Sequence, residues 1–310
     1  MSRKTLSIFL LLIIFCMMML TMTACSSMNY ETNIHEVNEK FNNISIKTDT
    51  ADIAFVPSAD GMCKVVCYED AEKSHSVEVQ NGTLAVNMVN DKKWYHHIGV
   101  NINSPKITIY LPKAEYSSLV IEESTGNIEI SKDFEFKSID ISLSTGDVKC
   151  YASSSETIKI VASTGDIYAE SISASSLELT VSTGRVTVSD VTCAGDITIG
   201  VSTGKAYLTD ITCKNLISTG RTGDISLKNV ISTEKTSIER STGDVTLEGS
   251  DAEELFITTD TGDVKGSLLT DKVFITKTDT GRIDVPNSIT GGRCEITTDT
   301  GDIKILISNN

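Results

Sequence analysis

The chain has 310 residues, and acidic side chains outnumber basic ones by 42 to 27, which gives a formal net charge of −15 at pH 7. Such a surface repels phosphates, so nucleic acid is excluded as a partner. Hydrophobic residues make up 40% of the chain, enough to bury a core, which argues against disorder. Aromatic residues are only 5%, and Trp94 is the single tryptophan, which argues against a sugar-stacking or enzymatic cleft.

The first residues are typical of a secretion signal. Arg3 and Lys4 precede the almost wholly apolar residues 5–23, and this stretch runs into a Met-Thr-Ala-Cys sequence that ends at Cys25. The pattern resembles a bacterial lipoprotein signal, which implies cleavage before Cys25 and lipidation of that cysteine. Two alternatives are an ordinary signal peptide in which Cys25 is incidental and an uncleaved membrane anchor of nearly spanning length.

The lipoprotein interpretation divides the start of the chain into two segments. Residues 1–24 are expected to be the signal peptide, and residues 25–40, which begin with the polar Ser26 and Ser27, are expected to be a flexible tether. Cleavage removes two basic residues and no acidic one, so the mature chain has a formal net charge of −17. We expect that chain to lie outside the cytoplasm, facing outward from the cell membrane to which its lipid anchors it.

A Thr-Gly pair recurs every 19 or 20 residues from residue 125 onward. The glycines of these pairs are Gly126, Gly146, Gly165, Gly184, Gly204, Gly223, Gly243, Gly262, Gly281 and Gly301. An earlier, degenerate copy has Ala51 in the glycine position. A fixed period of this length is typical of a solenoid, in which each repeat is one coil.

Aliphatic residues alternate with polar ones on both sides of each glycine. Around Gly184 the aliphatic residues are Leu177, Leu179, Val181, Val186, Val188 and Val191. This period of two predicts two short strands per coil, joined at the Thr-Gly corner. Because neither strand can bury its apolar face alone, we expect successive coils to stack with equivalent strands parallel. The threonines should line an inner edge, and each glycine should allow a positive φ or a close backbone approach.

The predicted fold is therefore an all-β, single-domain β-solenoid with coils of 19–20 residues and two short parallel-stacked strands per coil. Residues 119–310 are expected to form the regular solenoid. Residues 41–118 break the period and are expected to form an irregular N-terminal β cap with degenerate coils, including a hairpin that turns at Asn81-Gly82.

The residue after each glycine should point outward, and it is most often aspartate. A ladder of stacked carboxylates could bind calcium. Only Asp224, Asp244 and Asp263 form an uninterrupted run of three, and the glycine-rich nonapeptide of calcium β-rolls is absent, so a solvated corner with turn hydrogen bonds is favoured. A cation-binding structural solenoid stays open as an alternative.

One segment of the cap combines aromatic, basic and imidazole side chains. It consists of Lys92, Lys93, Trp94, Tyr95, His96 and His97. We interpret it as a candidate partner loop, since its chemistry differs from the acidic remainder; the alternative is that Trp94 plugs the open end of the solenoid. Adjacent histidines on a strand face opposite ways, so no metal site is predicted here.

The four cysteines of the repeat region fall into two groups. Cys150 and Cys294 occupy inward aliphatic positions and are expected to be small core residues. Cys193 and Cys213 each lie nine residues after the glycine of their own coil, so stacking places them one rung apart, and they are candidates for a disulfide.

The cap and the repeats together carry a family resemblance. The run from Pro105 to Lys113 (PKITIYLPK), then Leu119-Val120-Ile121, then repeated Ser-Thr-Gly-Asp-Ile, resembles the bacterial putative-adhesin domain of unknown function, or toast-rack solenoid, over residues 40–310. The resemblance implies an envelope location and an adhesion or envelope-stress role, with neither catalytic residues nor a cofactor.

Catalysis is also disfavoured by the residues themselves. The regular coils differ in length by one residue, which leaves no loop to build a cleft, and all four histidines precede residue 98. We therefore expect a non-enzymatic, lipid-anchored envelope protein with an adhesin-like binding or scaffold role and no small-molecule substrate. Its partners would be the membrane, through the lipid, and an unknown envelope protein or cell-wall component. A polysaccharide-acting β-helix enzyme is the remaining alternative.

Overall fold

The computed structural model describes residues 30–70, 73–90 and 105–308, and every regular element in them is a strand. The strands are β1 (Tyr30–Val37), β2 (Asn43–Thr50), β3 (Asp52–Pro57), β4 (Cys63–Asp70), β5 (Lys73–Gln80), β6 (Thr83–Asn90), β7 (Lys106–Leu111), β8 (Glu115–Thr125), β9 (Ile128–Ile130), β10 (Glu135–Thr145), β11 (Val148–Cys150), β12 (Ser153–Thr164), β13 (Ile167–Ala174), β14 (Ser176–Cys193), β15 (Asp196–Thr222), β16 (Ile225–Thr242), β17 (Val245–Thr261), β18 (Val264–Leu268), β19 (Lys272–Thr280), β20 (Ile283–Asp284), β21 (Gly292–Thr300) and β22 (Ile303–Ile307). These described residues contain no helix long and apolar enough to cross a bilayer.

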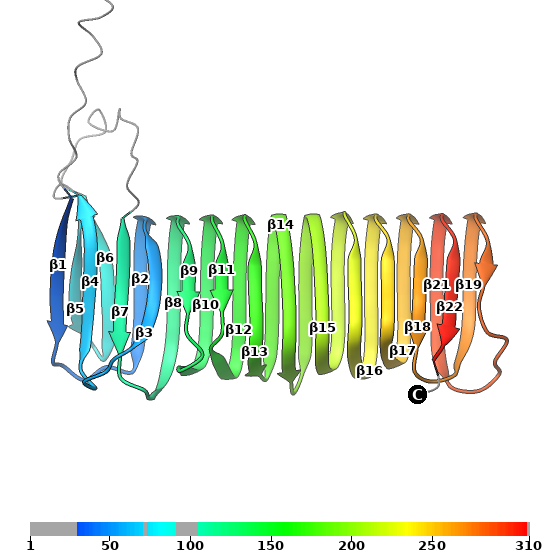
Figure 1. Ribbon diagram of the computed structural model, residues 1–310, viewed down its shortest axis with the longest axis horizontal. Coiled ribbons are helices and arrows are strands. Elements are labelled where there is room, and N and C mark those ends of the chain that lie inside the picture. Colours follow the sequence, from blue (N-terminus) through cyan, green and yellow to red (C-terminus); the bar gives the residue numbers. More distant parts are fainter. Residues whose placement is uncertain (1–29, 71–72, 91–104, 309–310) are drawn as a thin grey trace, which may run out of the picture.

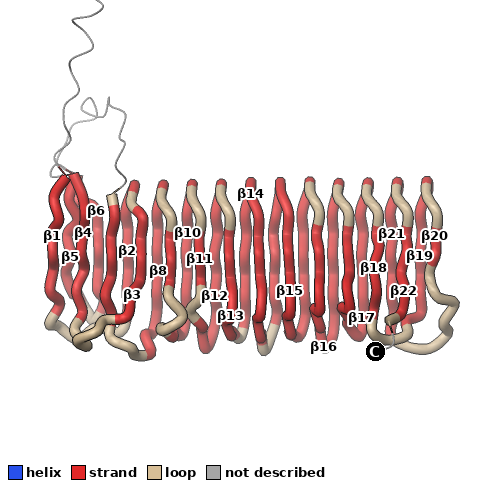
Figure 2. The backbone as a smooth tube through the Cα atoms, in the orientation of Figure 1, coloured by secondary structure: helices blue, strands red, loops and turns tan. Residues whose placement is uncertain are grey.

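The strands wind into a long β-solenoid, as Figures 1 and 2 show. Each coil places one strand before its Thr-Gly corner and one after it, and equivalent strands of neighbouring coils pair in parallel. In the central coils Leu177 pairs with Ile197, and Gly184 pairs with Gly204. The predicted all-β solenoid with parallel-stacked strands is thus confirmed.

A single apolar core runs along the inside of the coils. In the coil around Gly184 the alternating aliphatic residues are almost completely buried: Leu177, Leu179, Val181, Val186 and Val188 have no exposed surface, and Val191 has 2%. Each such side chain stabilises the fold by roughly 1.5–3 kcal/mol relative to an exposed one. The alternation predicted from the sequence therefore identifies the core correctly, and Cys150 and Cys294 belong to it as expected.

The corner glycines are required by a close approach of backbones. Gly184 has a φ of +147°, and a Cβ added to it would lie 1.8 Å from the carbonyl oxygen of Gly165. The same contact recurs from coil to coil, because each corner packs against the carbonyl of the corner before it. Among the described residues, Ala51 is the first corner of this stack. Residues 91–104, which connect β6 to β7, lie outside the described residues.

The corner threonines do not line an inner edge as expected. Thr125, Thr145, Thr164 and Thr183 are all exposed. The inward alternation ends three residues before each glycine, for example at Leu143 and Val181, because the backbone then rotates to turn the corner. The threonine prediction was wrong because strict alternation was extended through a bend.

The last two coils stack in reversed order. Thr300 pairs with Thr261 on one side and with Thr280 on the other, so β21 and β22 lie between β17–β18 and the outermost strands β19 and β20 (Figure 1). Cβ atoms on Gly291 and Gly292 would lie 1.8 Å from carbonyl oxygens of the coils on either side. The expectation that each coil stacks on the next in sequence is therefore corrected at this end.

A buried ion pair spans the inserted coil. Lys272 of the outermost coil reaches Asp251 with an Nζ–Oδ1 distance of 2.5 Å, and both side chains are at most 10% exposed. The Asp251 carboxylate also accepts the backbone N–H groups of Ala252 and Leu269. Because removing one partner of a buried pair leaves an uncompensated charge, loss of Lys272 or Asp251 would destabilise this end of the rod.

The N-terminal cap is a mixed sheet. The rung made by β2 and β3 lies between β8–β9 and β6–β7, all in parallel, while β1, β4 and β5 add antiparallel strands. The predicted turn at Asn81-Gly82 joins β5 to β6, and both residues have positive φ. Residues 30–37 of the segment expected to be a tether instead form β1, which pairs along its whole length with β4.

Candidate functional site

The aspartates after the glycines form a hydrogen-bonded ladder along one edge of the solenoid. The Oδ1 atom of Asp147 accepts the backbone N–H of Asp166 at 2.8 Å, and the same bond recurs between neighbouring corners. Because of the reversed coil order, the acidic run of Asp224, Asp244 and Asp263 continues to Asp302. Each carboxylate thus caps a backbone donor that the bend leaves without a strand partner, which gives aspartate a structural role at the corner.

Basic residues interrupt the ladder and pair with their neighbours. Lys205 lies next to Asp224, with 2.9 Å between Nζ and Oδ2, and this contact is the main reason why the pKa of Asp224 lies below its ordinary value. At the C-terminal end, Arg282 makes the same kind of pair with Asp302. These contacts relieve repulsion between stacked carboxylates.

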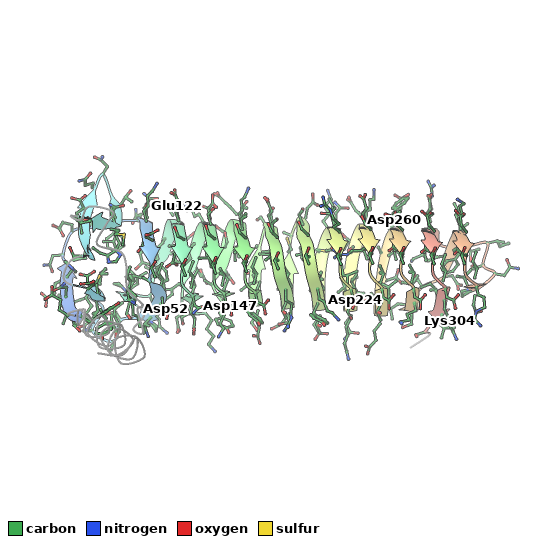
Figure 3. The ribbon with its side chains drawn as sticks, turned by 90° about the horizontal axis from the view of Figure 1, so that it is seen from above. Asp52, Glu122, Asp147, Asp224, Asp260 and Lys304 are labelled. Atoms are coloured by element: carbon green, nitrogen blue, oxygen red, sulfur yellow. The ribbon has the colours of Figure 1, made fainter. Side chains whose placement is uncertain are left out.

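Both broad faces of the rod carry similar pairs between adjacent rungs. Lys47 contacts Glu122, Lys159 contacts Glu178 and Lys228 contacts Glu248, at 2.9, 3.3 and 3.0 Å. Figure 3 shows Glu122 and Asp260 on one face and Asp52, Asp147 and Asp224 on the other. Exposed pairs of this kind contribute little to stability, about 0–1 kcal/mol each, so they mainly keep the faces polar.

Large exposed apolar side chains are concentrated near the two ends of the described rod. The cap carries Ile34, Met62, Tyr68 and Val89, and the C-terminal coils carry Val273, Ile275, Ile283, Ile289 and Leu306. In the described central coils, between these two ends, the large exposed apolar side chains are Tyr207 and Ile217. Since apolar anchors dominate the energies of protein interfaces, the ends are better suited to contact than the faces.

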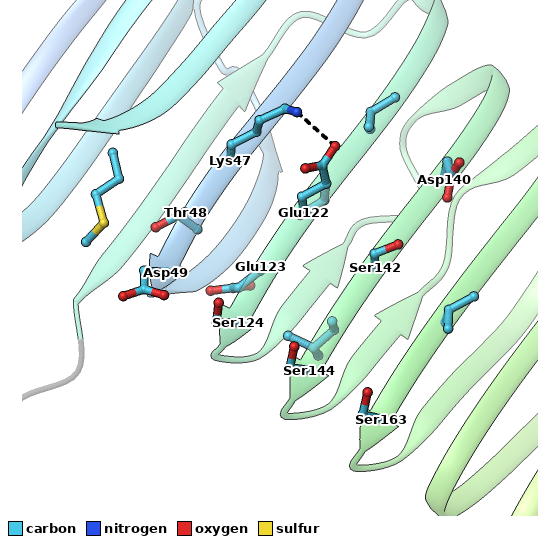
Figure 4. A pocket seen from close by; sticks show the side chains of 15 residues that line it. Lys47, Thr48, Asp49, Glu122, Glu123, Ser124, Asp140, Ser142, Ser144 and Ser163 are labelled. Carbon is cyan, nitrogen blue, oxygen red and sulfur yellow. Dashed lines mark ion pairs between the residues drawn. The ribbon is translucent and has the colours of Figure 1, made fainter. Parts of the chain in front are cut away.

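A groove of about 740 Å³ lies where the cap meets the first regular coils (Figure 4). Glu123 is in its wall, at an inward position where the next coils have Leu143 and Ala162. Its Oε1 atom accepts the backbone N–H of Ala51 at 3.0 Å, while Oε2 is buried with no hydrogen-bond partner among the described residues. Burial raises the pKa of Glu123 to about 8, so its carboxyl is mainly protonated at neutral pH.

A buried arginine interrupts the apolar core farther along the rod. Arg240 is 2% exposed and donates from Nη2 to the Ser218 hydroxyl at 2.9 Å. Its guanidinium fills the space left by Gly220, since a Cβ there would lie 1.5 Å from Nη1. Burial lowers the pKa of Arg240 to about 10. Aligning the coils by their glycines would have found this site, because serine, glycine and arginine replace aliphatic residues at neighbouring inward positions.

The candidate partner loop, Lys92 to His97, lies outside the described residues. The strands that flank it are in the cap, with Asn90 paired to Lys73 and Lys106 paired to Tyr68. The Tyr68 ring stacks on the ring of Tyr30, the first described residue, with 5.0 Å between centroids. The described residues next to these two segments, Tyr30 and Lys106, therefore lie at the same edge of the cap, on either side of Tyr68.

Cys193 and Cys213 lie on adjacent rungs, one residue beyond the paired Thr192 and Thr212. Both are free, buried thiols in the structure. The Cys213 sulfur lies 3.4 Å from the Ser232 hydroxyl. Burial raises the pKa of the Cys213 thiol to about 11, so little of it is present as the reactive thiolate at neutral pH. The disulfide between Cys193 and Cys213 stays a prediction.

The chain matches one protein-family model and is similar to several solved structures. The Toastrack DUF4097 family model matches residues 41–201 and 193–310. Similar solved structures include a putative lipid binding protein of Parabacteroides distasonis, with 16% sequence identity, coverage of 90% of this chain and 98% of that chain, and a TM-score of 0.49. A putative adhesin of Parabacteroides merdae has 13% identity, coverage of 90% and 97%, and a TM-score of 0.47. A putative adhesin of Bacteroides fragilis has 16% identity, coverage of 90% and 98%, and a TM-score of 0.44. The comparison with curated proteins found no match.

The buried carboxyl of Glu123 predicts a pH-dependent stability. Its folded pKa of about 8 lies above the ordinary 4.5, so its stabilising contribution is complete below pH 4.5 and is lost as the pH rises through 8. We expect wild-type protein to unfold at progressively lower temperature from pH 6 to pH 9, and Glu123→Gln to show a flatter profile by thermal melting. The control is Glu122→Gln, on the exposed face of the same strand. Equal slopes for wild type and Glu123→Gln would contradict the assignment.

Proposed function

This chain belongs to the Toastrack DUF4097 family, and on that premise we propose that it is a non-enzymatic protein of the bacterial cell envelope with an adhesin-like binding or scaffold role. A lipid on Cys25 would hold it on the outer side of the cell membrane, and its partner would be another envelope protein or a cell-wall component. The observation that carries the proposal is the contrast between the polar, ion-paired faces of the rod and its apolar ends.

A rod of this kind fits the role of a spacer with contacts at its ends. Several side-chain charges on the faces are paired between adjacent rungs, which keeps these faces polar and without large apolar anchors for a partner. The regular corners are two-residue bends that recur without insertions, and loops long enough to build a catalytic cleft are not present among the described regular coils. Both features favour binding or support over catalysis.

The anchor would put the cap next to the membrane. Cys25 lies five residues before Tyr30, and five residues span at most about 18 Å. Lys106, which follows the partner loop, pairs with Tyr68, and the Tyr68 ring stacks on that of Tyr30, so we place lipid and loop on the same side of the cap. The remainder of the rod would extend away from this contact.

The loop concentrates aromatic, basic and imidazole side chains in six consecutive residues. Trp94 and Tyr95 are aromatic anchors, and Lys92 and Lys93 give a local positive charge on an acidic protein. Such a segment suits an acidic or amphipathic partner that the remaining surface would repel. We therefore place the proposed contact there, at the membrane-proximal end.

The anchor is tested by Cys25→Ala. We expect wild-type protein to fractionate with membranes and to be released only by detergent, because its lipid chain inserts in the bilayer. The variant should move to the soluble extracytoplasmic fraction, as measured by immunoblotting of the fractions. Processed Cys25→Ala protein that stays membrane-bound until detergent is added would count against lipidation.

The contact is tested by Trp94→Ala combined with Tyr95→Ala. We expect the double variant to lose binding to isolated cell envelopes at least tenfold while its melting temperature changes by no more than a degree or two, since exposed anchors contribute to binding and not to the core. The matched control is Tyr207→Ala, an exposed aromatic on the central coils, which should bind normally. A fall of several degrees with unchanged binding would instead assign Trp94 and Tyr95 to the plug of the solenoid.

A further inference from the structure

Three metal-ligating side chains meet inside the N-terminal cap. Cys67 and Glu69 are on β4 and His75 is on β5, and their ligand atoms all lie within 4.8 Å of one another. All three are buried, with exposures of 0%, 1% and 4%. A thiol, a carboxylate and an imidazole are all donor types that transition metals accept, and the predicted role of the cap does not use them.

Hydrogen bonds hold the outer atoms of two of these groups. The Nε2 atom of His75 lies 2.8 Å from the Thr48 hydroxyl, and Oε1 of Glu69 accepts from Asn33 Nδ2 at 2.8 Å. The inner atoms, His75 Nδ1 and Glu69 Oε2, face each other at 2.6 Å. Fixing the outer atom of a ligand orients its inner atom, and this kind of support is typical of metal sites.

We propose that Cys67, Glu69 and His75 bind one transition-metal ion of borderline softness, for which Zn²⁺ is the best match. Zinc takes sulfur, nitrogen and oxygen ligands together in tetrahedral geometry. Calcium and magnesium require several oxygen ligands, and this cluster has one carboxylate. Water would complete the coordination at the fourth position, since the cluster itself offers three ligand atoms.

Binding requires a small rearrangement and the release of one proton. Without metal, the short Nδ1–Oε2 contact is satisfied by a proton on Nδ1, and Thr48 donates to Nε2. With metal, that proton resides on Nε2 and is donated to the Thr48 oxygen, which frees Nδ1 as a ligand. The Cys67 thiol loses its proton to solvent and binds as thiolate, so one H⁺ leaves for each ion bound.

A bound ion would tie together the two strands that close the end of the solenoid. The strands β4 and β5 are adjacent in sequence, and the cap shields the first rung of the core from water. Because metal that binds only the folded state raises its apparent stability, the site would make the cap depend on metal supply. This inference is independent of the proposed adhesin-like role, since it concerns the interior of the cap and not its contact surface.

The test is cobalt binding to full-length protein in detergent after removal of metal with a chelator. We expect Co²⁺ to bind at one equivalent with a thiolate-to-cobalt charge-transfer band in the near ultraviolet and visible bands of a tetrahedral ion, and Zn²⁺ to abolish both. One proton should be released per ion, and the melting temperature should rise.

Two variants and one control separate this site from other thiols of the chain. Cys67→Ser should remove the charge-transfer band, and Thr48→Val should weaken binding about 10–100-fold while the band persists, because the threonine only orients His75. Cys63→Ser, on the same buried face of β4 but outside the cluster, should bind as wild type does. The proposal is overturned if wild-type protein binds no Co²⁺, or if Cys67→Ser and Cys63→Ser give the same band as wild type.

Discussion

The stacking of the coils depends on one short contact, in which the carbonyl oxygen of one corner occupies the place of a side chain on the next. At Gly184 and Gly204 a Cβ would lie within 2 Å of the preceding corner's oxygen. That distance excludes every residue except glycine at these corners and lets the corners stack at the spacing of about 4.8 Å that paired strands require. Given this spacing, the inward aliphatic residues stack into one core, and the aspartate side chains reach the neighbouring backbone N–H groups.

The stacked coils also accommodate two ionisable side chains, Glu123 and Arg240, at inward positions that are aliphatic in other coils. Glu123 is accommodated because it lies beside the first corner, where Ala51 offers a backbone donor. Arg240 is accommodated because Ser218 and Gly220 on the preceding rung supply an acceptor and a space. In each case a group one rung away supplies one hydrogen bond, because the ladder places equivalent positions next to each other. The polar cluster of the cap occurs where the ladder gives way to antiparallel strands.

Periodicity in the sequence was sufficient to predict the coils, their parallel stacking and the inward residues from Leu177 to Val191, because spacing alone decides which side chains face the core. The period could not predict the reversed order of the last two coils. The coil of Thr300 pairs in the same register whether it lies between the coils of Thr261 and Thr280 or outside the coil of Thr280. Nor could the period bring His75 to Cys67, because antiparallel pairings within the cap have no period. The lipid anchor and the partner loop lie outside the described residues and stay predictions.

The close approach at the corners is tested most directly by the melting temperatures of Gly184→Ala and Gly61→Ala. Both glycines have positive φ, but an added Cβ meets a carbonyl oxygen at 1.8 Å in Gly184 and nothing within 4 Å in Gly61. Gly61→Ala should cost about 1 kcal/mol of backbone strain. Gly184→Ala should cost about 3 kcal/mol or more, because the adjacent backbones must separate, and it should melt several degrees lower. Equal melting temperatures for the two variants would contradict the account.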